Sequence, residues 1–327
     1  MNKFIIITTI NEKTHAITEF EKFKDWHIVL VGDVKSVPIK NSERLTYLSI
    51  KDQERLGFKL ANLSNKNHYA RKNIGYLFAI KNGANIIYDT DDDNIPYDYW
   101  SFPDFKCDNI CVSSNKFINI YKLFTDDNVW PRGYPLDQVT TKSSYSLNND
   151  KTHEIGIWQG LADKQPDVDA IYRLIINKPI RFNQNTPFCL PENFYCPINS
   201  QNTLWRKEAF HLLYLPNYVS FRFTDILRGY IAQRLLWQQK LLVGYTGASV
   251  FQERNTHNLM TDFEDEIIFY TNTKRIVDYL DNIKLTNSAT QNLLQVYEGL
   301  QNINIIAKEE LIMCKTWLED LEMIMNI

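Results

Sequence analysis

The sequence predicts an α/β protein, built as a Rossmann-like, mostly parallel β-sheet flanked by helices and followed by a helical C-terminal appendage. Two observations support this class. Apolar, β-branched strand candidates alternate with helix-like segments in the first part of the chain, and from residue 259 onward helical periodicity continues without a strand candidate. We therefore expect two units, a catalytic and ligand-binding domain over residues 1–258 and a helical extension over residues 259–327.

The N-terminal segments read as βαβ units. Residues 4–9 (FIIITT) and 27–33 (HIVLVGD) are typical of strands buried on both faces, and residues 43–50 are a short third candidate. A helix is expected within residues 67–84, and the strand of residues 85–89 (NIIYD) follows it. Open sheets of this kind bind ligands beyond the carboxyl ends of their strands.

The middle of the chain is less regular. Residues 109–114 and 154–160 resemble strands, whereas residues 187–202 hold three prolines and are expected to form a long loop. A long helix is predicted from Thr224, which is a plausible N-cap, and residues 241–246 form the next strand candidate.

Composition excludes several classes of function. The 327 residues are 44% hydrophobic, enough for a large core, and a net charge of −3 with a pI near 6.1 gives no overall positive field for nucleic acid. The five cysteines are an odd number without zinc-ribbon spacing, so we expect reduced thiols. No uncharged run approaches the length of a membrane span, so the sequence predicts a cytoplasmic protein without one.

The most informative stretch is IIYDTDDDN, residues 86–94, where four aspartates occupy five positions directly after a predicted strand. Like charges this close repel one another unless a cation lies among them. An EF-hand loop is disfavoured because, counting from Asp89, Asn94 and Trp100 replace the required glycine and glutamate. A phosphohydrolase motif is disfavoured by Asp93 in its fifth position, and a solvated acidic turn is the remaining structural alternative.

The interpretation that we favour is a strand-end Asp-x-Asp in which Asp89 and Asp91, with Thr90 between them, hold Mn²⁺ or Mg²⁺ against a nucleotide diphosphate. Such ions take one or two carboxylates and complete their shell with phosphate oxygens and water. The preceding segment, ARKNIGYLFAIKNGA, resembles the nucleotide-sugar half of GT-A glycosyltransferases. The resemblance implies that Arg71 and Lys72 face the donor and that Asn73 hydrogen-bonds backbone nearby, with a solvated basic turn as the alternative.

Asp225 is the candidate catalytic base. It opens the helix DILRGYIAQRLLW and resembles the acidic pair of inverting GT-A enzymes, with Thr224 in place of the first acid. A carboxylate at a helix N-terminus is stabilised in its ionised form and can accept a proton from a hydroxyl. The alternative is a capping aspartate, and Arg228, one turn later, is a possible ion-pair partner.

Four motifs then follow in order: residues 130–136 (WPRGYPL), 157–174 (IWQGLADKQPDVDAIYRL), 197–210 (PINSQNTLWRKEAF) and 225–237. Together they resemble the STELLO-type family of glycosyltransferases, over roughly residues 72–254. The resemblance implies a GT-A fold and nucleotide-sugar chemistry. Plant members are linked to cellulose synthesis, so it also implies a role in polysaccharide synthesis.

Further site residues are expected from their positions relative to this fold. Those expected to bind the donor lie at the ends of the first two strands, in the WPRGYP motif and on the loop beneath the sugar: Thr8, Thr9, Asn11, Asp33, Arg132, Asn199 and Asn202. His257 is the candidate third metal ligand, with Gln252 and Glu253 as rivals. Trp205 is expected to stack on a sugar or to pack internally. Asp163, Asp167 and Asp169 are expected to be surface and capping residues.

The sequence thus predicts a metal-dependent hexosyltransferase that moves a sugar from a UDP-linked donor to a glycan, lipid-linked or other hydroxyl acceptor, with inversion at C1. A sugar-nucleotide mutase or nucleotidyltransferase is one alternative, although residues 8–15 (TTINEKTH) lack the glycine-rich phosphate loop of the latter. A non-catalytic GT-A-like scaffold is the other. The C-terminal helices are a candidate surface for oligomer contacts.

Overall fold

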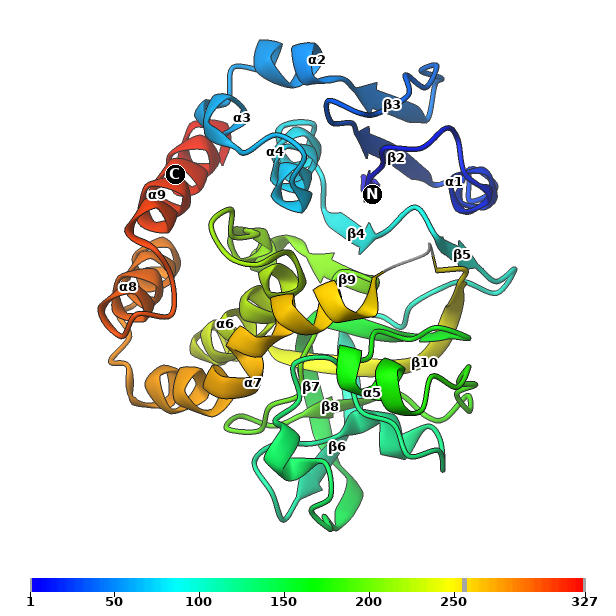
Figure 1. Ribbon diagram of the computed structural model, residues 1–327, viewed down its shortest axis with the longest axis vertical. Helices are drawn as coiled ribbons and strands as arrows, with labels where there is room; N and C mark the ends of the chain where they lie inside the picture. The colour runs from blue at the N-terminus through cyan, green and yellow to red at the C-terminus, as the bar shows by residue number, and fades with distance from the viewer. Residues whose placement is uncertain (1, 255–257, 326–327) are drawn as a thin grey trace.

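The computed structural model describes residues 2–254 and 258–325, and in this part of the chain ten strands form one mixed sheet with the order β3-β2-β1-β4-β9-β7-β6-β8-β10-β5 (Figure 1). The strands are β1 (Lys3–Thr8), β2 (Trp26–Val31), β3 (Leu45–Leu48), β4 (Ile86–Thr90), β5 (Asn94–Pro96), β6 (Lys106–Ser113), β7 (Tyr145–Asp163), β8 (Phe188–Leu190), β9 (Asn202–Arg206) and β10 (Leu242–Gln252).

Helices cover the sheet and continue to the C-terminus. They are α1 (His15–Phe20), α2 (Ile50–Arg55), α3 (Lys59–Leu63), α4 (Lys72–Lys81), α5 (Ala170–Ile175), α6 (Thr224–Gln238), α7 (Leu259–Asn282), α8 (Ala289–Asn302) and α9 (Lys308–Met325). Short 3₁₀ turns are η1 (Tyr69–Arg71), η2 (Ile120–Leu123), η3 (Leu136–Gln138), η4 (Lys207–Leu213) and η5 (Phe221–Phe223). No helix of the described residues is long and apolar enough to span a bilayer.

The N-terminal half of the sheet is parallel, as predicted. β1 lies between β2 and β4, and Ile5 is paired with Ile28 on one side and with Tyr88 on the other. All three residues are almost completely buried, which is the environment that uninterrupted β-branched strands favour. The carboxyl ends of β1, β2 and β4 therefore meet at one edge, where Thr8, Val31 and Thr90 end their strands.

The second half of the sheet is mixed, so the prediction of a mostly parallel sheet holds only for the first half. β9 runs antiparallel to both β4 and β7, between which it lies. Residues 187–202, expected to be a loop, contain β8 and lead directly into β9. β9 is short and ends in Arg206, so its sequence alone gives no strong strand pattern.

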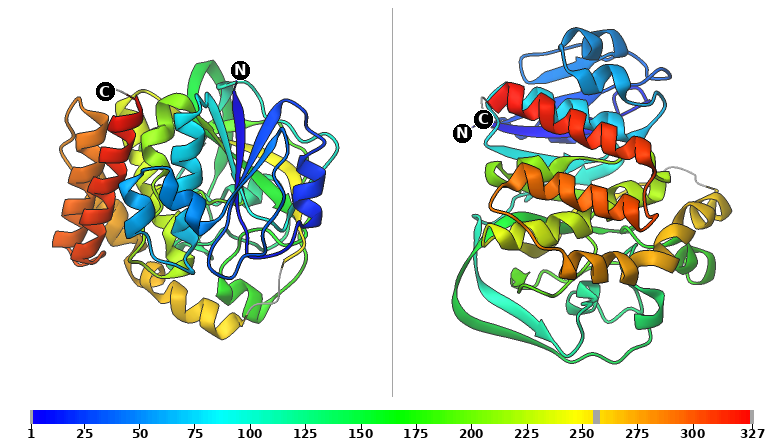
Figure 2. Two further views of the ribbon diagram at one scale, coloured as in Figure 1. Left: turned by 90° about the horizontal axis from the view of Figure 1, so that it is seen from above. Right: turned by 90° about the vertical axis from the view of Figure 1, so that its left-hand side faces the viewer.

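Helix α4 packs tightly on the parallel strands and lies on the side opposite to α1 (Figure 2). A Cβ at Gly75 would lie only 2.6 Å from Val31 and 2.7 Å from Ile6, so glycine permits this close approach. This close packing places the start of α4 beneath the carboxyl end of β4, where Lys72 Nζ donates to the carbonyl of Thr90.

Helix α6 begins as predicted, but Thr224 is its first residue and not its N-cap. The N-cap is Phe223, without a side-chain bond, while the Thr224 hydroxyl donates to the carbonyl of Ser220 at 3.2 Å. The preceding 3₁₀ turn η5 leads straight into α6, which leaves no extended cap position. Nearly the whole helix is buried, because α6 lies between the sheet and the C-terminal helices.

Helices α7, α8 and α9 lie along one side of the α/β part (Figure 1). They share one hydrophobic core with it, and buried carboxylates of α9 bind it as well. Glu310 on α9 accepts hydrogen bonds from the Tyr214 hydroxyl and from the backbone N–H groups of Asn217 (2.8 Å) and Tyr218 (2.6 Å). Asp320 on α9 caps the start of α3, accepting from the N–H groups of Lys59 and Leu60. Helix α9 therefore holds two segments that are far apart in the sequence, the start of α3 and residues 214–218.

Glu310 gives a testable pH dependence of stability. Burial raises the pKa of its carboxyl from 4.5 to about 7, so the folded state holds the proton more tightly than the unfolded state. Its contribution to stability is therefore complete below pH 4.5 and is lost as the pH rises through 7. Glu310→Gln should flatten the fall in unfolding free energy across this range by about 3 kcal/mol, measured by urea denaturation.

The matched control is Glu309→Gln, which alters an exposed neighbour on the same helix turn. This variant should keep the wild-type pH profile. If Glu310→Gln and the wild type instead lose stability in parallel between pH 4.5 and 7, the proton held by Glu310 is not the cause.

Candidate functional site

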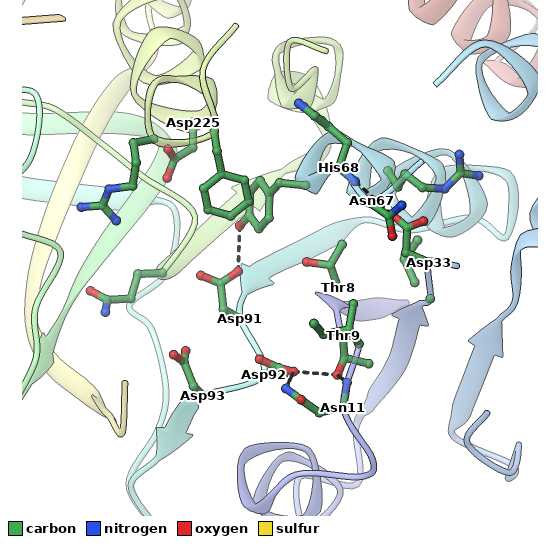
Figure 3. Close-up of a pocket in the computed structure, with 18 of the residues that line it drawn as sticks. Thr8, Thr9, Asn11, Asp33, Asn67, His68, Asp91, Asp92, Asp93 and Asp225 are labelled. Atoms are coloured by element: carbon green, nitrogen blue, oxygen red, sulfur yellow. Dashed lines mark hydrogen bonds between the residues drawn. The ribbon is translucent and has the colours of Figure 1, made fainter. Parts of the chain in front are cut away.

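A cavity of about 660 Å³ opens at the edge where β1, β2 and β4 end and where α6 begins. Eight residues predicted to form the site line it: Thr8, Thr9, Asn11, Asp33, Arg71, Asp91, Arg132 and Asp225. These residues come from segments more than two hundred positions apart, and Figure 3 shows most of them around one space. The structure thus brings together the predicted base, the acidic segment and the ends of the first two strands.

Five other predicted residues lie beneath the cavity, where they support its lining. Asn73 bonds the backbone N–H and carbonyl of Leu215, as expected for a residue that orders backbone near the site. The Thr90 hydroxyl donates to the Gln201 carbonyl, and Asn202 bonds the Tyr88 hydroxyl. Asn199 and Asp89 are likewise buried. None of the five lines this cavity, and His257 lies outside the described residues.

Asp89 is held by two buried cations. Its oxygens lie 2.7 Å from Lys72 Nζ and 2.9 Å from Arg228 Nη2, and all three side chains are almost inaccessible to solvent. Arg228 also lies over the ring of Trp205, which is fully buried and packs internally. With its charge neutralised and its side chain enclosed, Asp89 stabilises the base of the acidic segment, and the expectation that it contacts a metal directly has no support in this geometry.

The next three aspartates extend into the cavity, as Figure 3 shows. Asp91 accepts from the Tyr69 hydroxyl at 2.7 Å and from Lys72 Nζ at 3.1 Å. Asp92 accepts from the Thr9 hydroxyl at 2.6 Å and from Asn11, which ties the segment to the end of β1. Asp93 accepts from Gln252 Nε2 at 3.0 Å, at the end of β10.

The pKa values of Asp91 and Asp93 reflect burial first and neighbouring charges second. Burial raises the pKa of Asp91 above its ordinary value, against the opposing effect of Lys72. Burial, together with the neighbouring Asp91 carboxylate, raises the pKa of Asp93 to about 7. Both carboxylates would be stabilised in their ionised forms by an added cation.

The donor set fits a hard divalent ion. In residues 2–254 and 258–325 no three His, Cys, Asp or Glu side chains come together as a metal-binding group. Two carboxylates, Asp91 and Asp93, nevertheless line the cavity, and Mg²⁺ and Mn²⁺ commonly take only one or two carboxylates together with phosphate oxygens and water. Asp91 and Asp93 are therefore the two residues of this lining that could hold such an ion.

Asp225 lies at the start of α6 and forms a bidentate pair with Arg132, at 2.9 and 2.8 Å. A second edge of the Arg132 guanidinium, formed by Nε and Nη2, donates to both carboxylate oxygens of Asp167, at 2.7 and 2.8 Å. The predicted pairing of Asp225 with Arg228 is therefore wrong, because Arg228 turns toward Asp89. Burial raises the pKa of Asp225, but Arg132 outweighs this effect and holds the pKa below its ordinary value.

The opposite wall of the cavity is formed by the end of β2 and by η1. Asp33 accepts from the backbone N–H groups of Val34 (2.7 Å) and His68 (3.0 Å), so its carboxylate orders the loop that precedes η1. The Arg71 guanidinium is largely buried and donates to Gln53 and to the Ser64 carbonyl. Most of its donors are therefore used within the protein, and Lys72 is buried on Asp89 instead of facing the cavity.

Several residues of the cavity were not predicted. Asp93 and Asp92 belong to the acidic run, but the strand-end spacing drew attention to Asp89 instead. Asp167 was expected at the surface and is buried on Arg132, and Asp163 is also buried, whereas Asp169 caps α5 as expected. Arg222 and Arg254 also line the cavity, paired with acids of α7 at 2.7 Å each. No local pattern links these distant residues.

The comparison with known proteins agrees with the family that the sequence motifs resemble. The family model described as STELLO glycosyltransferases matches residues 222–326, from η5 through α9. Two proteins of Arabidopsis thaliana, named probable glycosyltransferases STELLO1 and STELLO2, are 27% and 29% identical over 98% and 85% of this chain. The chain spans less than half of these relatives, 44% and 39% of their lengths. The predicted resemblance is confirmed, and the chain is related to the STELLO glycosyltransferases.

Proposed function

We propose that this protein is a metal-dependent glycosyltransferase of GT-A type that transfers a hexose from a nucleotide-diphosphate sugar, with UDP as the nucleotide, to an acceptor hydroxyl. The observation that carries the proposal is the meeting of Asp91, Asp93 and Asp225 in one cavity at the carboxyl ends of β1, β2 and β4. The names of the relatives support the reaction class.

The chain's own residues divide the donor site into two parts. Asp91 and Asp93 would hold Mn²⁺ or Mg²⁺, and the bound ion would neutralise charge on the departing diphosphate. Thr8, Thr9, Asn11 and Asp33 form the part toward the ends of β1 and β2, where the nucleoside would lie. The ring of Phe221, half exposed and packed edge-on against Tyr69, closes this space from the side of α6.

Asp225 would act as the base that accepts the proton of the acceptor hydroxyl. Its lowered pKa keeps the carboxylate ionised at neutral pH, and the bidentate Arg132 fixes its orientation. The same ion pair weakens its basicity, so orientation matters more than proton affinity here. Attack on C1 from the face opposite to the diphosphate inverts the anomeric carbon in one displacement, without a protein nucleophile.

A thermal-shift panel tests the donor class. Nucleotide diphosphates and UDP-sugars, each with and without Mn²⁺, are added to the protein, and a ligand present at about a hundred times its Kd should raise the unfolding free energy by about 2.7 kcal/mol. We expect the shift only with a UDP compound and metal together. A shift by UDP that is unchanged by a chelator would contradict the metal, and no shift with any nucleotide would favour a scaffold.

A further inference from the structure

A second cavity, of about 610 Å³, adjoins the first. The two share Gln252 and Arg254, at and just beyond the end of β10. Gln252 donates to Asp93, so the boundary between the cavities lies beside the acidic segment. A ligand held in the second cavity would therefore extend toward the place where the sugar is transferred.

The positive groups of this second cavity are Lys164, Arg173 and Arg254. Two of them have acidic partners, because Lys164 pairs with Glu253 at 3.0 Å and Arg254 pairs with Asp262 at 2.7 Å. Arg173 is different. Its Nη atoms donate to neutral groups, Gln165 and the Pro166 carbonyl, and its Nε is buried without a partner.

Arg173 is 4% exposed, and no carboxylate of the described residues forms an ion pair with it. The neighbouring arginines of the first cavity are balanced: Arg132 by Asp167 and Asp225, and Arg222 by Glu266. Burial, with the charges of Arg254 and Arg222, lowers the pKa of Arg173 to about 9, against the opposing charges of Asp167 and Asp262. A buried cation without an ion-paired anion is costly, and a phosphate group suits a guanidinium well.

Exposed apolar residues lie next in sequence to residues that line the second cavity, between Arg173 and Asn177 and beside Leu259. Leu174, Ile175 and Ile176 directly follow Arg173 and are 43%, 76% and 40% exposed. Met260, next to the lining residue Leu259, is 56% exposed at the start of α7, against which α5 packs. Exposed apolar residues gathered beside a basic pocket are typical of surfaces that meet lipid.

We propose that the second cavity binds the phosphate of an anionic lipid acceptor, whose hydrocarbon chain lies on residues 174–176 and Met260 and whose hydroxyl-bearing end extends into the first cavity. The proposal rests on the proposed function for its reaction, because it names the acceptor class of the same site. The lipid is recognised by charge at Arg173 and by apolar contact at Ile175.

The test is binding to vesicles of phosphatidylcholine with and without phosphatidic acid, measured by co-sedimentation of the whole chain. We expect binding only when phosphatidic acid is present. Ile175→Ser should weaken it about tenfold, since it removes an exposed side chain that contacts the hydrocarbon. Arg173→Gln should weaken it about fivefold. Ile312→Ser, an equally simple change of a 58% exposed isoleucine on α9, should have no effect.

Three results would overturn the lipid proposal. The first is equal binding to vesicles with and without phosphatidic acid, and the second is equal weakening by Ile312→Ser and Ile175→Ser. The third is that inorganic phosphate competes with the vesicles while Ile175→Ser binds them as well as the wild type, which would indicate a phosphate site without a lipid contact. The thermal shift with UDP and Mn²⁺, measured on Ile175→Ser, separates this proposal from the proposed function. If Ile175→Ser keeps the thermal shift with UDP and Mn²⁺ but loses vesicle binding, the lipid site is distinct from the donor site. If the wild type shows no thermal shift with UDP and Mn²⁺, the proposed donor site is contradicted and the lipid proposal is not.

Discussion

Replacing Asp225 with asparagine is expected to lower the turnover number by about 10²–10⁴-fold, while the thermal shift caused by UDP and Mn²⁺ stays near that of the wild type. Asparagine keeps the shape of the side chain and one acceptor oxygen for Arg132, but it cannot take a proton from the acceptor hydroxyl. The measurement is the initial rate of UDP release in the presence of acceptor, at saturating donor.

Asp167→Asn is the matched control. Asp167 binds the same guanidinium of Arg132 with the same bidentate geometry, and it is as deeply buried as Asp225. The two variants should therefore lose similar stability in urea, because each removes one of two carboxylates from Arg132. Only Asp225→Asn should show the large loss of turnover. Equal losses in both variants would mean that the placement of Arg132, and not proton transfer to Asp225, limits the rate.

Strand ends were the part of the site that the sequence could predict. Thr8, Asp33 and Asp91 follow or close apolar runs that are buried on both faces, and in a parallel sheet the carboxyl ends of neighbouring strands meet at one edge. The hydrophobic pattern therefore identifies these residues as neighbours although they are far apart in sequence. Asp225 was singled out differently, by its position at the start of a predicted helix together with the resemblance of that segment to the acidic pair of inverting GT-A enzymes.

Ion pairs were the part that the sequence could not predict. Asp89 and Arg228 are 139 positions apart, and no periodicity relates them. The favoured metal pair was Asp89 with Asp91, whereas in the structure Asp89 is enclosed by Lys72 and Arg228, and Asp93 lines the cavity instead. A run of aspartates at a strand end shows that cations are needed, but which aspartate meets a protein cation depends on the tertiary fold.

The C-terminal helices show a similar limit. Their periodicity predicts helices after residue 259, as found, but does not indicate that they help to build the site. Glu266 on α7 binds Arg222, and Glu310 on α9 holds residues 214–218, just before Phe221 of the cavity wall. The match to the family model, residues 222–326, likewise includes both the start of α6 and the three C-terminal helices.

Asp91→Asn and Asp93→Asn are each expected to abolish the metal-dependent part of the thermal shift with UDP. An amide binds a hard divalent ion far more weakly than a carboxylate, so the ligand-linked stabilisation of about 2.7 kcal/mol expected at a hundredfold excess over Kd should disappear. The readout is the difference in unfolding temperature with UDP between samples with Mn²⁺ and with chelator. It reports donor binding directly, without requiring a known acceptor.

Without metal and nucleotide, the same two substitutions should not lower the stability of the protein. The pKa values of Asp91 and Asp93 are raised by burial and, for Asp93, by the neighbouring carboxylate, so removing one charge in the absence of metal relieves the cost of burying it and, at Asp93, repulsion. Each variant should therefore be at least as stable as the wild type without ligand, which separates lost metal binding from misfolding. Asp98→Asn makes the same change of charge at an exposed residue outside the cavity and should retain the full shift. If Asp91→Asn and Asp93→Asn keep a wild-type response to Mn²⁺, the acidic segment does not hold the ion, and donor binding must depend on other residues of the cavity.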